Sequence, residues 1–483
     1  MSEGSGKRGR LATLTTRGLA VSASSSINVA FFFARNIMLA RVLGPADFGI
    51  AIAILTISSA IDVVSDMGWD KFLIQWDQKG HTIAEAQGVV HLLRLGVGLL
   101  MSVGIVLLST PLAHLLDVPH AAGAIAALAA PVMLRSAMHI DYKYGQRDLK
   151  FGGEALVESS RSIVDLAVAV SAAVLLHSYW AMTLAITGGA FASFVMSHIL
   201  ARQRAWPLWR AGLGMAILAF GAPLVVNNVL VYIAGQGDRL LVGIQFGVQD
   251  LAIYGAALTL IAGPQAVVSR GLMMVALPIL VKARSNIGAF QAIFAQLGAT
   301  AVGLCALVSV PIILFGPELV HLAFGEGFPP DPLLSALLAM SQGLNILRTW
   351  AIGGLVANAH TKVVPLANIF RISGFATAIL AASMGATLEG VAACLLGGEL
   401  LGVAAALWWH GRLVHTVPVS VFQLMAVLAA CWLAAGATQT FTDSMILRAF
   451  ALAGVLAVNA GLCFAVVSAE RRKSRTVGTP PAA

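Results

Sequence analysis

The chain has 483 residues, of which 58% are hydrophobic and only 11% are charged, and its formal net charge is +8. Soluble proteins carry about 25% charged and about 45–50% apolar residues, so this composition excludes a soluble globular protein, a disordered chain and a secreted disulfide scaffold. With a mean hydropathy of +0.87, the chain is predicted to be a polytopic membrane protein. Lys and Arg lie in short clusters between apolar runs, which argues against a nucleic acid partner.

The apolar runs predict many membrane-spanning helices, because one span needs roughly 20 apolar residues. We expect about fourteen spans. They cover approximately 15–41, 46–69, 87–109, 119–140, 155–177, 179–200, 213–237, 251–281, 290–315, 332–358, 363–385, 387–409, 418–439 and 445–468. The runs lack the alternation of short barrel strands, so the predicted fold class is all-α.

The positions of Lys and Arg predict the orientation of the chain, because these residues favour the cytoplasmic side. They gather near the N-terminus, in alternate loops and in the tail after residue 470. This alternation indicates an even number of helices with both termini in the cytoplasm.

A weak internal repeat predicts two lobes. Segment 35–48, at the end of the first span, aligns with segment 238–251, at the end of the seventh, and Gly44 aligns with Gly247. Secondary transporters are commonly built from such repeats, with the substrate site between them; the alternative is a chance match. The predicted organisation is a six-helix lobe over 1–210, a second over 211–412, two additional helices over 413–470 and a basic cytoplasmic tail over 471–483.

Ionisable residues inside the predicted spans indicate a watery cavity, because an ion in a bilayer core costs at least ~2.5–3.5 kcal/mol. Arginines outnumber nearby acidic residues, and surplus guanidinium suits an anion such as phosphate. The candidate substrate-binding residues of this cationic cavity are Arg35, Arg135, Arg239, Arg270, Arg348 and Arg371. The candidates for carrying protons or sodium during coupling are Asp62, Asp66, Asp238 and Glu399.

Structural roles are the alternative for these charges. Arg161 and Asp165 lie four apart on one helix face and are expected to pair. Arg94 and Arg448 lie near predicted span ends, from which long side chains can reach water.

Motifs for catalysis or metal binding are not found in the sequence. The four cysteines fit no zinc or redox spacing and read as buried hydrophobes. There is no P-loop, and no large extracytoplasmic loop for glycosyl transfer. We therefore expect neither an enzyme nor a metal or other cofactor.

A resemblance to a known family rests on residues 34–49, which read ARNIMLARVLGPADFG. The string Ala-Arg-x-Leu-Gly-Pro-x-Asp-Phe-Gly after a first helix resembles the Wzx-type oligosaccharide flippases of the multidrug/oligosaccharidyl-lipid/polysaccharide exporter superfamily. Further similar segments are 66–68, 147–151 and 238–254. Counting helix number and repeat, the resemblance extends over essentially the whole chain.

The resemblance implies a fold and a substrate. The family moves undecaprenyl-pyrophosphate-linked oligosaccharide units from the cytoplasmic to the periplasmic leaflet of the bacterial inner membrane, for exopolysaccharide, O-antigen or capsule synthesis. Two six-helix lobes form a V around a central cavity and work by alternating access. The implied partners are this lipid-linked substrate, membrane lipids, and a polymerase and a chain-length regulator of the same pathway.

The resemblance also singles out Arg35. Related lipid II flippases have an arginine–acidic pair where Arg35 and Asn36 stand here. Arg35 matches and is the best single candidate for contact with pyrophosphate or an acidic sugar. Asn36 departs from the pattern, so no local ion pair is expected there.

Three other functions are weighed against the flippase. A multidrug or cation antiporter of the same fold would favour an acidic cavity, which the arginine surplus argues against. A membrane polysaccharide polymerase or glycosyltransferase would show a large extracytoplasmic loop. A non-transporting scaffold would not require the intramembrane charges.

Overall fold

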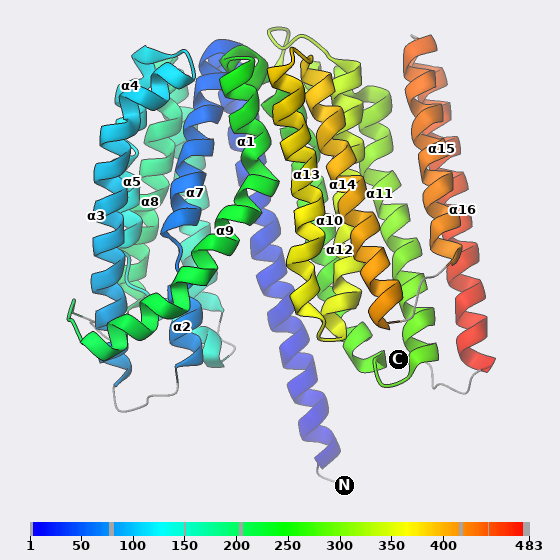
Figure 1. Ribbon diagram of the computed structural model, residues 1–483, viewed down its shortest axis with the longest axis horizontal. Coiled ribbons are helices and arrows are strands. Elements are labelled where there is room, and N and C mark those ends of the chain that lie inside the picture. Colours follow the sequence, from blue (N-terminus) through cyan, green and yellow to red (C-terminus); the bar gives the residue numbers. More distant parts are fainter. Residues whose placement is uncertain are drawn as a thin grey trace. The chain divides into compact units, whose positions relative to one another are not determined.

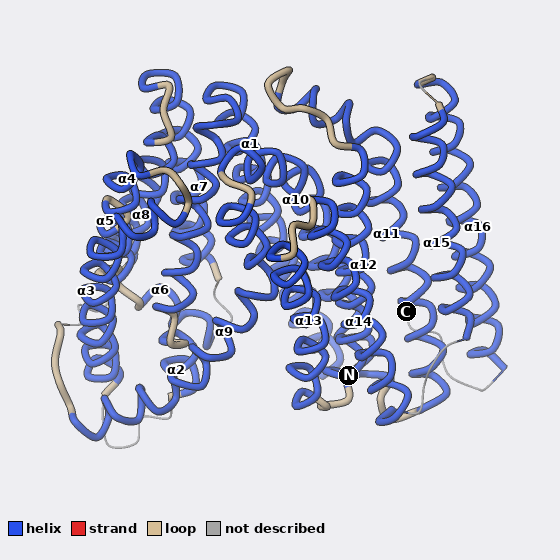
Figure 2. Tube along the Cα trace, turned by 45° about the horizontal axis from the view of Figure 1, so that its top comes forward, coloured by secondary structure: helices blue, strands red, loops and turns tan. Residues whose placement is uncertain are grey.

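The computed structural model describes residues 3–76, 82–148, 151–201, 206–414, 419–442 and 444–476, and within them every regular element is a helix, as Figure 2 shows. The α-helices are α1 Glu3–Ser65, α2 Trp69–Gln75, α3 Ile83–Leu115, α4 Ala122–Ala126, α5 Ala129–Ser136, α6 Asp141–Tyr144, α7 Gly152–Leu176, α8 Trp180–Leu200, α9 Ala211–Gln245, α10 Val248–Ala283, α11 Ile287–Phe324, α12 Pro332–Ala357, α13 Val364–Ser383, α14 Leu388–Val414, α15 Val419–Phe441 and α16 Met445–Thr476. Three short 3-10 helices are η1 Pro119–Ala121, η2 Gly145–Asp148 and η3 Thr361–Val363. The predicted all-α fold class is confirmed.

The number of spans is close to the expected fourteen. In the described part of the chain, 11 helices are long and apolar enough to cross a membrane, or 12 if the bent pair at 119–147 forms one span. Two differences account for the gap between this count and the expected fourteen. The second predicted span and most of the first fall in one continuous stretch, Ile27–Gln75, which contains the end of α1 and all of α2. In addition, α12, which carries several polar residues, falls outside the set.

The division within α1 lies at Gly44, whose φ of 72° and ψ of 176° interrupt the helix. Such a φ favours glycine, and Pro45 then begins the next helical stretch, where a missing N–H does no harm. Figure 1 shows the two halves of α1 (dark blue) meeting at this turn. The aligned Gly247, between α9 and α10, also has a positive φ, of 87°. The two copies of the repeat therefore share a glycine turn at the same point.

The two turns touch. A Cβ added to Gly49, just after the first turn, would lie 1.8 Å from the carbonyl oxygen of Val248, just after the second. The backbones approach this closely because residue 49 has no side chain.

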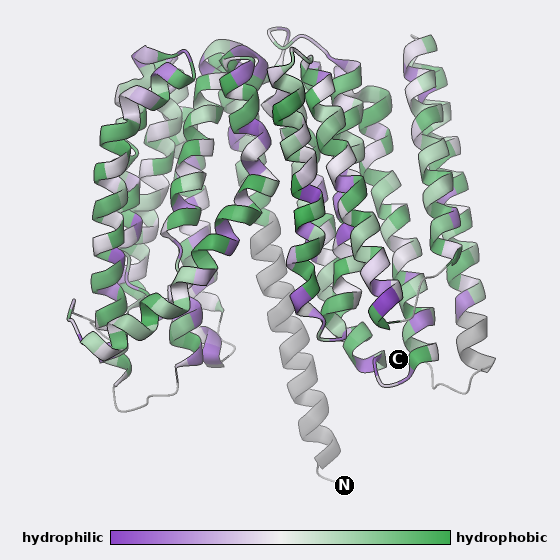
Figure 3. Cartoon of the chain, viewed as in Figure 1, coloured by the Kyte–Doolittle hydropathy of each residue, from purple (hydrophilic) through white to green (hydrophobic). Residues whose placement is uncertain are grey.

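The chain forms two compact units, one ending at Ala252 and one beginning at Ile253. The predicted boundary at 210/211 falls before α9, whereas the first unit includes α9. Large apolar side chains are exposed on both units, for example Leu107 (72%), Leu175 (78%) and Leu433 (73%). Figure 3 shows the same apolar colouring along most helices, interrupted by polar patches. Many apolar spanning helices with apolar outer surfaces describe a multi-pass membrane protein.

Helix α9 belongs to the first unit because it packs closely against the end of α1. A Cβ on Gly221 would lie 2.7 Å from the Cβ of Met67. The hydroxyl of Tyr232 donates a 2.6 Å hydrogen bond to the carbonyl oxygen of Thr56. These contacts hold α9 beside the segment that carries the cavity residues described next.

Candidate functional site

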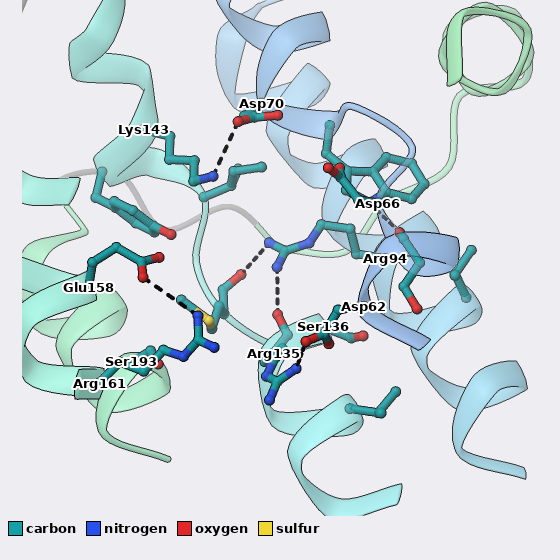
Figure 4. A pocket seen from close by; sticks show the side chains of 17 residues that line it. Asp62, Asp66, Asp70, Arg94, Arg135, Ser136, Lys143, Glu158, Arg161 and Ser193 are labelled. Carbon is teal, nitrogen blue, oxygen red and sulfur yellow. Dashed lines mark hydrogen bonds and ion pairs between the residues drawn. The ribbon is translucent and has the colours of Figure 1, made fainter. Parts of the chain in front are cut away.

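A charged cavity of about 340 Å³ lies inside the first unit. Its walls come from α1, α2, α3, α5, α6, α7 and α8 and the connecting segments. The ionisable groups among the lining residues, shown in Figure 4, are Asp62, Asp66, Asp70, Glu158, Arg94, Arg135, Lys143 and Arg161, besides the phenol of Tyr142. Four carboxylates and four basic side chains therefore meet in one cavity between apolar helices.

Two of the predicted residues form an ion pair across this cavity. Arg135 of α5 contacts the carboxylate of Asp62 of α1, and their side chains are 19% and 39% exposed. The partial exposure leaves both groups accessible to a polar ligand. The predicted Asp66 also lines the cavity, and its carboxylate accepts a 2.9 Å hydrogen bond from the Gly68 backbone N–H.

The turn at Gly68 explains why three acidic residues of neighbouring positions face one space. Gly68 has a positive φ of 68°, which glycine adopts readily, and it caps the start of α2. The backbone thus changes direction between the end of α1 and α2. Asp62, Asp66 and Asp70 line the same cavity although they do not lie on one continuous helix.

Arg94 of α3 lies between the other charged groups in Figure 4. Its guanidinium donates hydrogen bonds to the carbonyl oxygens of Met138, at 2.7 Å, and Arg135, at 2.5 Å. These oxygens lie where α5 ends before the bend to α6, so Arg94 stabilises the broken span. Arg94, expected to reach water near a span end, has a partly exposed side chain that lines the cavity.

Two further ion pairs complete the cavity. The Nζ atom of Lys143 lies 3.2 Å from a carboxylate oxygen of Asp70. Arg161 pairs with Glu158 on the same helix at 3.6 Å. The predicted pairing of Arg161 with Asp165 is wrong, since Asp165 contacts a different helix.

The residue that pairs with Asp165 is Arg35 of α1. The Arg35 Nη1 atom donates a 2.8 Å hydrogen bond to the Asp165 carboxylate, and Nη2 donates to the Asn36 side-chain oxygen at 3.3 Å. Arg35 is only 3% exposed and is not among the residues that line the cavity. Its guanidinium also lies 4.8 Å from the ring centre of Phe32. The structure thus shows Arg35 in a buried ion pair on α1 and α7.

A second charged cluster lies within the second unit. Glu399 of α14 lies between Arg348 of α12, at 3.3 Å, and Arg371 of α13. Arg348 also donates a 3.3 Å hydrogen bond to the Asn368 side chain. Three of the four predicted residues of this unit are therefore brought together, with two cations around one carboxylate.

The remaining predicted residues are not gathered with these clusters. Asp238 and Arg239 lie partly buried near the end of α9, and Arg270 is exposed on α10. Arg448, expected to reach water, is instead 7% exposed and bonded to carbonyl oxygens of residues 439 and 442 and to Glu318.

Sequence reasoning missed Asp70, Lys143 and Tyr142 as cavity residues. Lys143 lies outside the membrane in the predicted topology, among the positive loop residues, and Asp70 lies just beyond the second predicted span. The bent segment α5–α6 and the short α2 bring both side chains to the cavity. The signals that could have pointed there are Gly68 and the weak hydropathy between residues 134 and 150.

The cavity provides hydrogen-bond donors and acceptors inside an apolar unit. A polar molecule that enters the cavity can replace a protein partner of one of these groups. The new hydrogen bonds offset the free energy lost when the molecule leaves water. Among the described residues no cluster of three or more His, Cys, Asp or Glu has the arrangement of a metal site.

Comparison with known proteins gives matches of two kinds. A family model described as polysaccharide biosynthesis protein matches residues 38–330. The succinoglycan biosynthesis transport protein ExoT of Rhizobium meliloti (strain 1021) is 22% identical over 241 residues, which make up 50% of this chain and 48% of that relative. The chain thus spans about half the length of the curated relative it matches.

Solved structures show the fold that the chain shares. The lipid II flippase MurJ in an inward closed conformation superposes with a TM-score of 0.73 at 13% identity, over 92% of this chain and 98% of MurJ. An inward-facing multidrug resistance MATE family transporter of the MOP superfamily gives 0.59 at 13% identity, over 80% and 94% of the two chains. At these identities the likeness establishes a common fold.

Proposed function

The chain belongs to the polysaccharide biosynthesis protein family, and from this premise we propose that it is a flippase for lipid-linked oligosaccharides. It carries undecaprenyl-pyrophosphate-linked repeat units from the cytoplasmic to the periplasmic leaflet of a bacterial inner membrane, by alternating access. Both termini lie in the cytoplasm, and no chemical bond is made or broken. A polymerase and a chain-length regulator act on the same material.

The observation that carries this proposal is the charged cavity between apolar helices. A sugar or pyrophosphate group cannot cross a bilayer unaided, because its polar atoms lose water without new partners. The cavity supplies four basic and four acidic side chains, some of them paired. The helices that surround it are apolar on their outer surfaces. The prenyl tail can stay in lipid while the head group exchanges water for these partners.

The predicted residues take different parts in this scheme. We assign Arg135 and Asp62 to the sugar head group, because they are the partly exposed pair of the cavity. In the second unit, taken by itself, Arg348 and Arg371 form a cluster with excess positive charge, which suits a phosphoryl group. Arg35 contributes by fixing α1 against α7.

A cation or multidrug antiporter is the second candidate. The observation that favours it is the set of four carboxylates in the cavity, which equals the number of basic groups. A cation would be held by Asp62 and Asp66 in place of their present partners.

Reconstitution in liposomes tests both functions. The purified protein should flip a fluorescent undecaprenyl-pyrophosphate-linked oligosaccharide across the bilayer, and the double variant Asp62→Asn with Arg135→Gln should flip it at least ~10-fold more slowly. Arg284→Gln, an exposed arginine outside the cavity, is the matched control and should keep the wild-type rate. Cation-dependent drug uptake without lipid flipping would replace the flippase by the antiporter.

A deletion strain provides the cellular test. Accumulation of the undecaprenyl-linked repeat unit on the cytoplasmic leaflet is the expected result. Accumulation on the periplasmic leaflet would point to a polymerase and would contradict the proposal.

A further inference from the structure

The cluster of Arg348, Arg371 and Glu399 carries one excess positive charge. Two of its three helices, α13 and α14, are long and apolar enough to cross a membrane. Glu399 follows the start of α14 by 11 residues, a rise of roughly 16 Å. Arg348 is the one charged residue of α12, and Arg371 that of α13. No other charged side chain of these two neighbouring helices can therefore balance the excess.

The arginines use only part of their hydrogen-bonding capacity on Glu399. Both arginines contact the Glu399 carboxylate through their Nε atoms. The Arg348 Nε lies 3.3 Å from one carboxylate oxygen, and the Arg371 Nε contacts the other. Arg348 directs one terminal nitrogen to the neutral side chain of Asn368. The terminal nitrogens of Arg371 have no acceptor within the described part of the chain, and its side chain is 15% exposed. A ligand can reach these donors.

The helix backbones around the cluster are held closely together. A Cβ on Gly398 would lie 2.6 Å from the Arg371 carbonyl oxygen and 2.7 Å from the Gly374 Cα. A Cβ on Gly402 would lie 3.2 Å from the Arg371 Cβ. Because α13 and α14 are packed backbone to backbone here, a rearrangement of the cluster is a movement of side chains.

We propose that the Glu399 carboxylate occupies an anion site in place of the substrate, and that a phosphoryl group displaces it together with uptake of one proton. A phosphoryl group has oxygens that two guanidinium forks bind more fully than one carboxylate does. The displaced Glu399, whose side chain is 5% exposed, loses both counter-charges. A buried unpaired carboxylate is costly, so the neutral acid forms by taking one proton from water.

The exchange takes the cluster from one excess positive charge to neutrality. Without the ligand the cluster holds two guanidinium groups and one carboxylate. With the ligand it holds two guanidinium groups, a neutral carboxylic acid and the diphosphate anion. Binding of the anion is thereby linked to protons, which gives the proposed flippase a place for energy coupling; this inference rests on the proposed function.

The test is the pH dependence of anion binding to the purified full-length protein. The probe is a short-chain prenyl-diphosphate-linked sugar, because a diphosphate diester lacks the second ionisation, at about pH 6, of a phosphate monoester and so keeps a constant charge around neutral pH. Linkage of one proton should tighten wild-type binding up to about tenfold for each unit of decreasing pH. Addition of the probe to weakly buffered protein should also remove about one proton from solution per bound ligand, a measurement that needs no variant.

Glu399→Gln should bind the probe with an affinity that changes little with pH, because an amide takes up no proton. Glu399→Asp should retain the pH dependence, and Glu326→Gln, at an exposed loop position of the same unit, is the matched control. Binding without proton uptake, or unchanged pH dependence in Glu399→Gln, would overturn the inference while leaving the proposed function in place. Failure of the wild-type protein to bind the probe and to flip lipid-linked oligosaccharide would overturn both.

Discussion

Arg35 and Asp165 form a 2.8 Å ion pair although 130 positions separate them in the sequence. Their side chains are only 4% and 16% exposed, so water could not take the place of either charged partner. The pair joins α1 to α7 and places the residue that most resembles a substrate-binding arginine in a structural contact.

Removing one partner of this pair should destabilise the protein strongly. Breaking a buried ion pair costs about 3–5 kcal/mol, because the remaining charge is left uncompensated. Arg35→Gln should lower the melting temperature of the purified protein in detergent, and the double variant with Asp165→Asn should recover most of the loss. Glu158→Gln is the control, since its pair with Arg161 is 42–47% exposed and contributes about 0–1 kcal/mol. A double variant no more stable than Arg35→Gln would contradict a simple pair.

The sequence could not reveal this pairing. Spacing along one helix predicts contacts only within that helix, and there it favoured Arg161 for Asp165. The choice between partners depends on which faces of α1 and α7 meet, and both faces are rich in apolar residues. The same limit applies to Arg348, Arg371 and Glu399, each of which was a candidate alone but not as a cluster.

The helices themselves were predictable because their apolar runs are long. Every predicted span overlaps a helix, and Gly44 and Gly247, aligned from the sequence, both adopt a positive φ at a turn between helices. The resemblance to polysaccharide exporters is confirmed by the family model. The predicted span over 119–140 ends before α6, and the bend between α5 and α6 is not evident from the sequence, because the Arg94 side chain that bonds the carbonyl oxygens there comes from a different helix.

Gly49 should tolerate no side chain. A Cβ there would lie 1.8 Å from the Val248 carbonyl oxygen, which is backbone and cannot rotate away. Gly49→Val should abolish or sharply reduce the yield of folded protein, since overpacking costs about 1–3 kcal/mol even where side chains can adjust. Gly104→Val is the matched control, because no atom lies within 4 Å of its added Cβ. Size-exclusion chromatography of fluorescent fusions measures both, and equal yields would refute the close contact.

Tyr232 should tie α9 to α1 measurably. Its buried hydroxyl donates a 2.6 Å hydrogen bond to the Thr56 carbonyl oxygen. Tyr232→Phe should cost about 0.5–1.5 kcal/mol, seen as a lower midpoint of thermal unfolding. Asn228→Ala removes an exposed 3.0 Å hydrogen bond from the same helix to the Asp66 carbonyl oxygen and should cost less, because water replaces it. The reverse order would show that α9 is held mainly at its exposed contact.

Arg448 should anchor α16 to the other helices of the second unit. Its guanidinium donates to the carbonyl oxygens of Thr442, at 2.8 Å, and Gln439, at 3.2 Å, and pairs with Glu318 of α11. Arg448→Met keeps most of the side-chain volume but removes all of these bonds. Since Arg448 is 7% exposed, the variant should lose about 3–5 kcal/mol and unfold at a clearly lower temperature.

The matched control for this anchor is Arg412→Met. Arg412 is exposed and lies 4.8 Å from the ring centre of Trp408, a contact that contributes about 0.5–1 kcal/mol at an exposed site. Glu318→Gln should have an intermediate effect, because Glu318 is 35% exposed and its amide can still accept from Arg448. If Arg448→Met were as stable as Arg412→Met, the carbonyl contacts would contribute little and α16 would be held by its packing against α11 and α15.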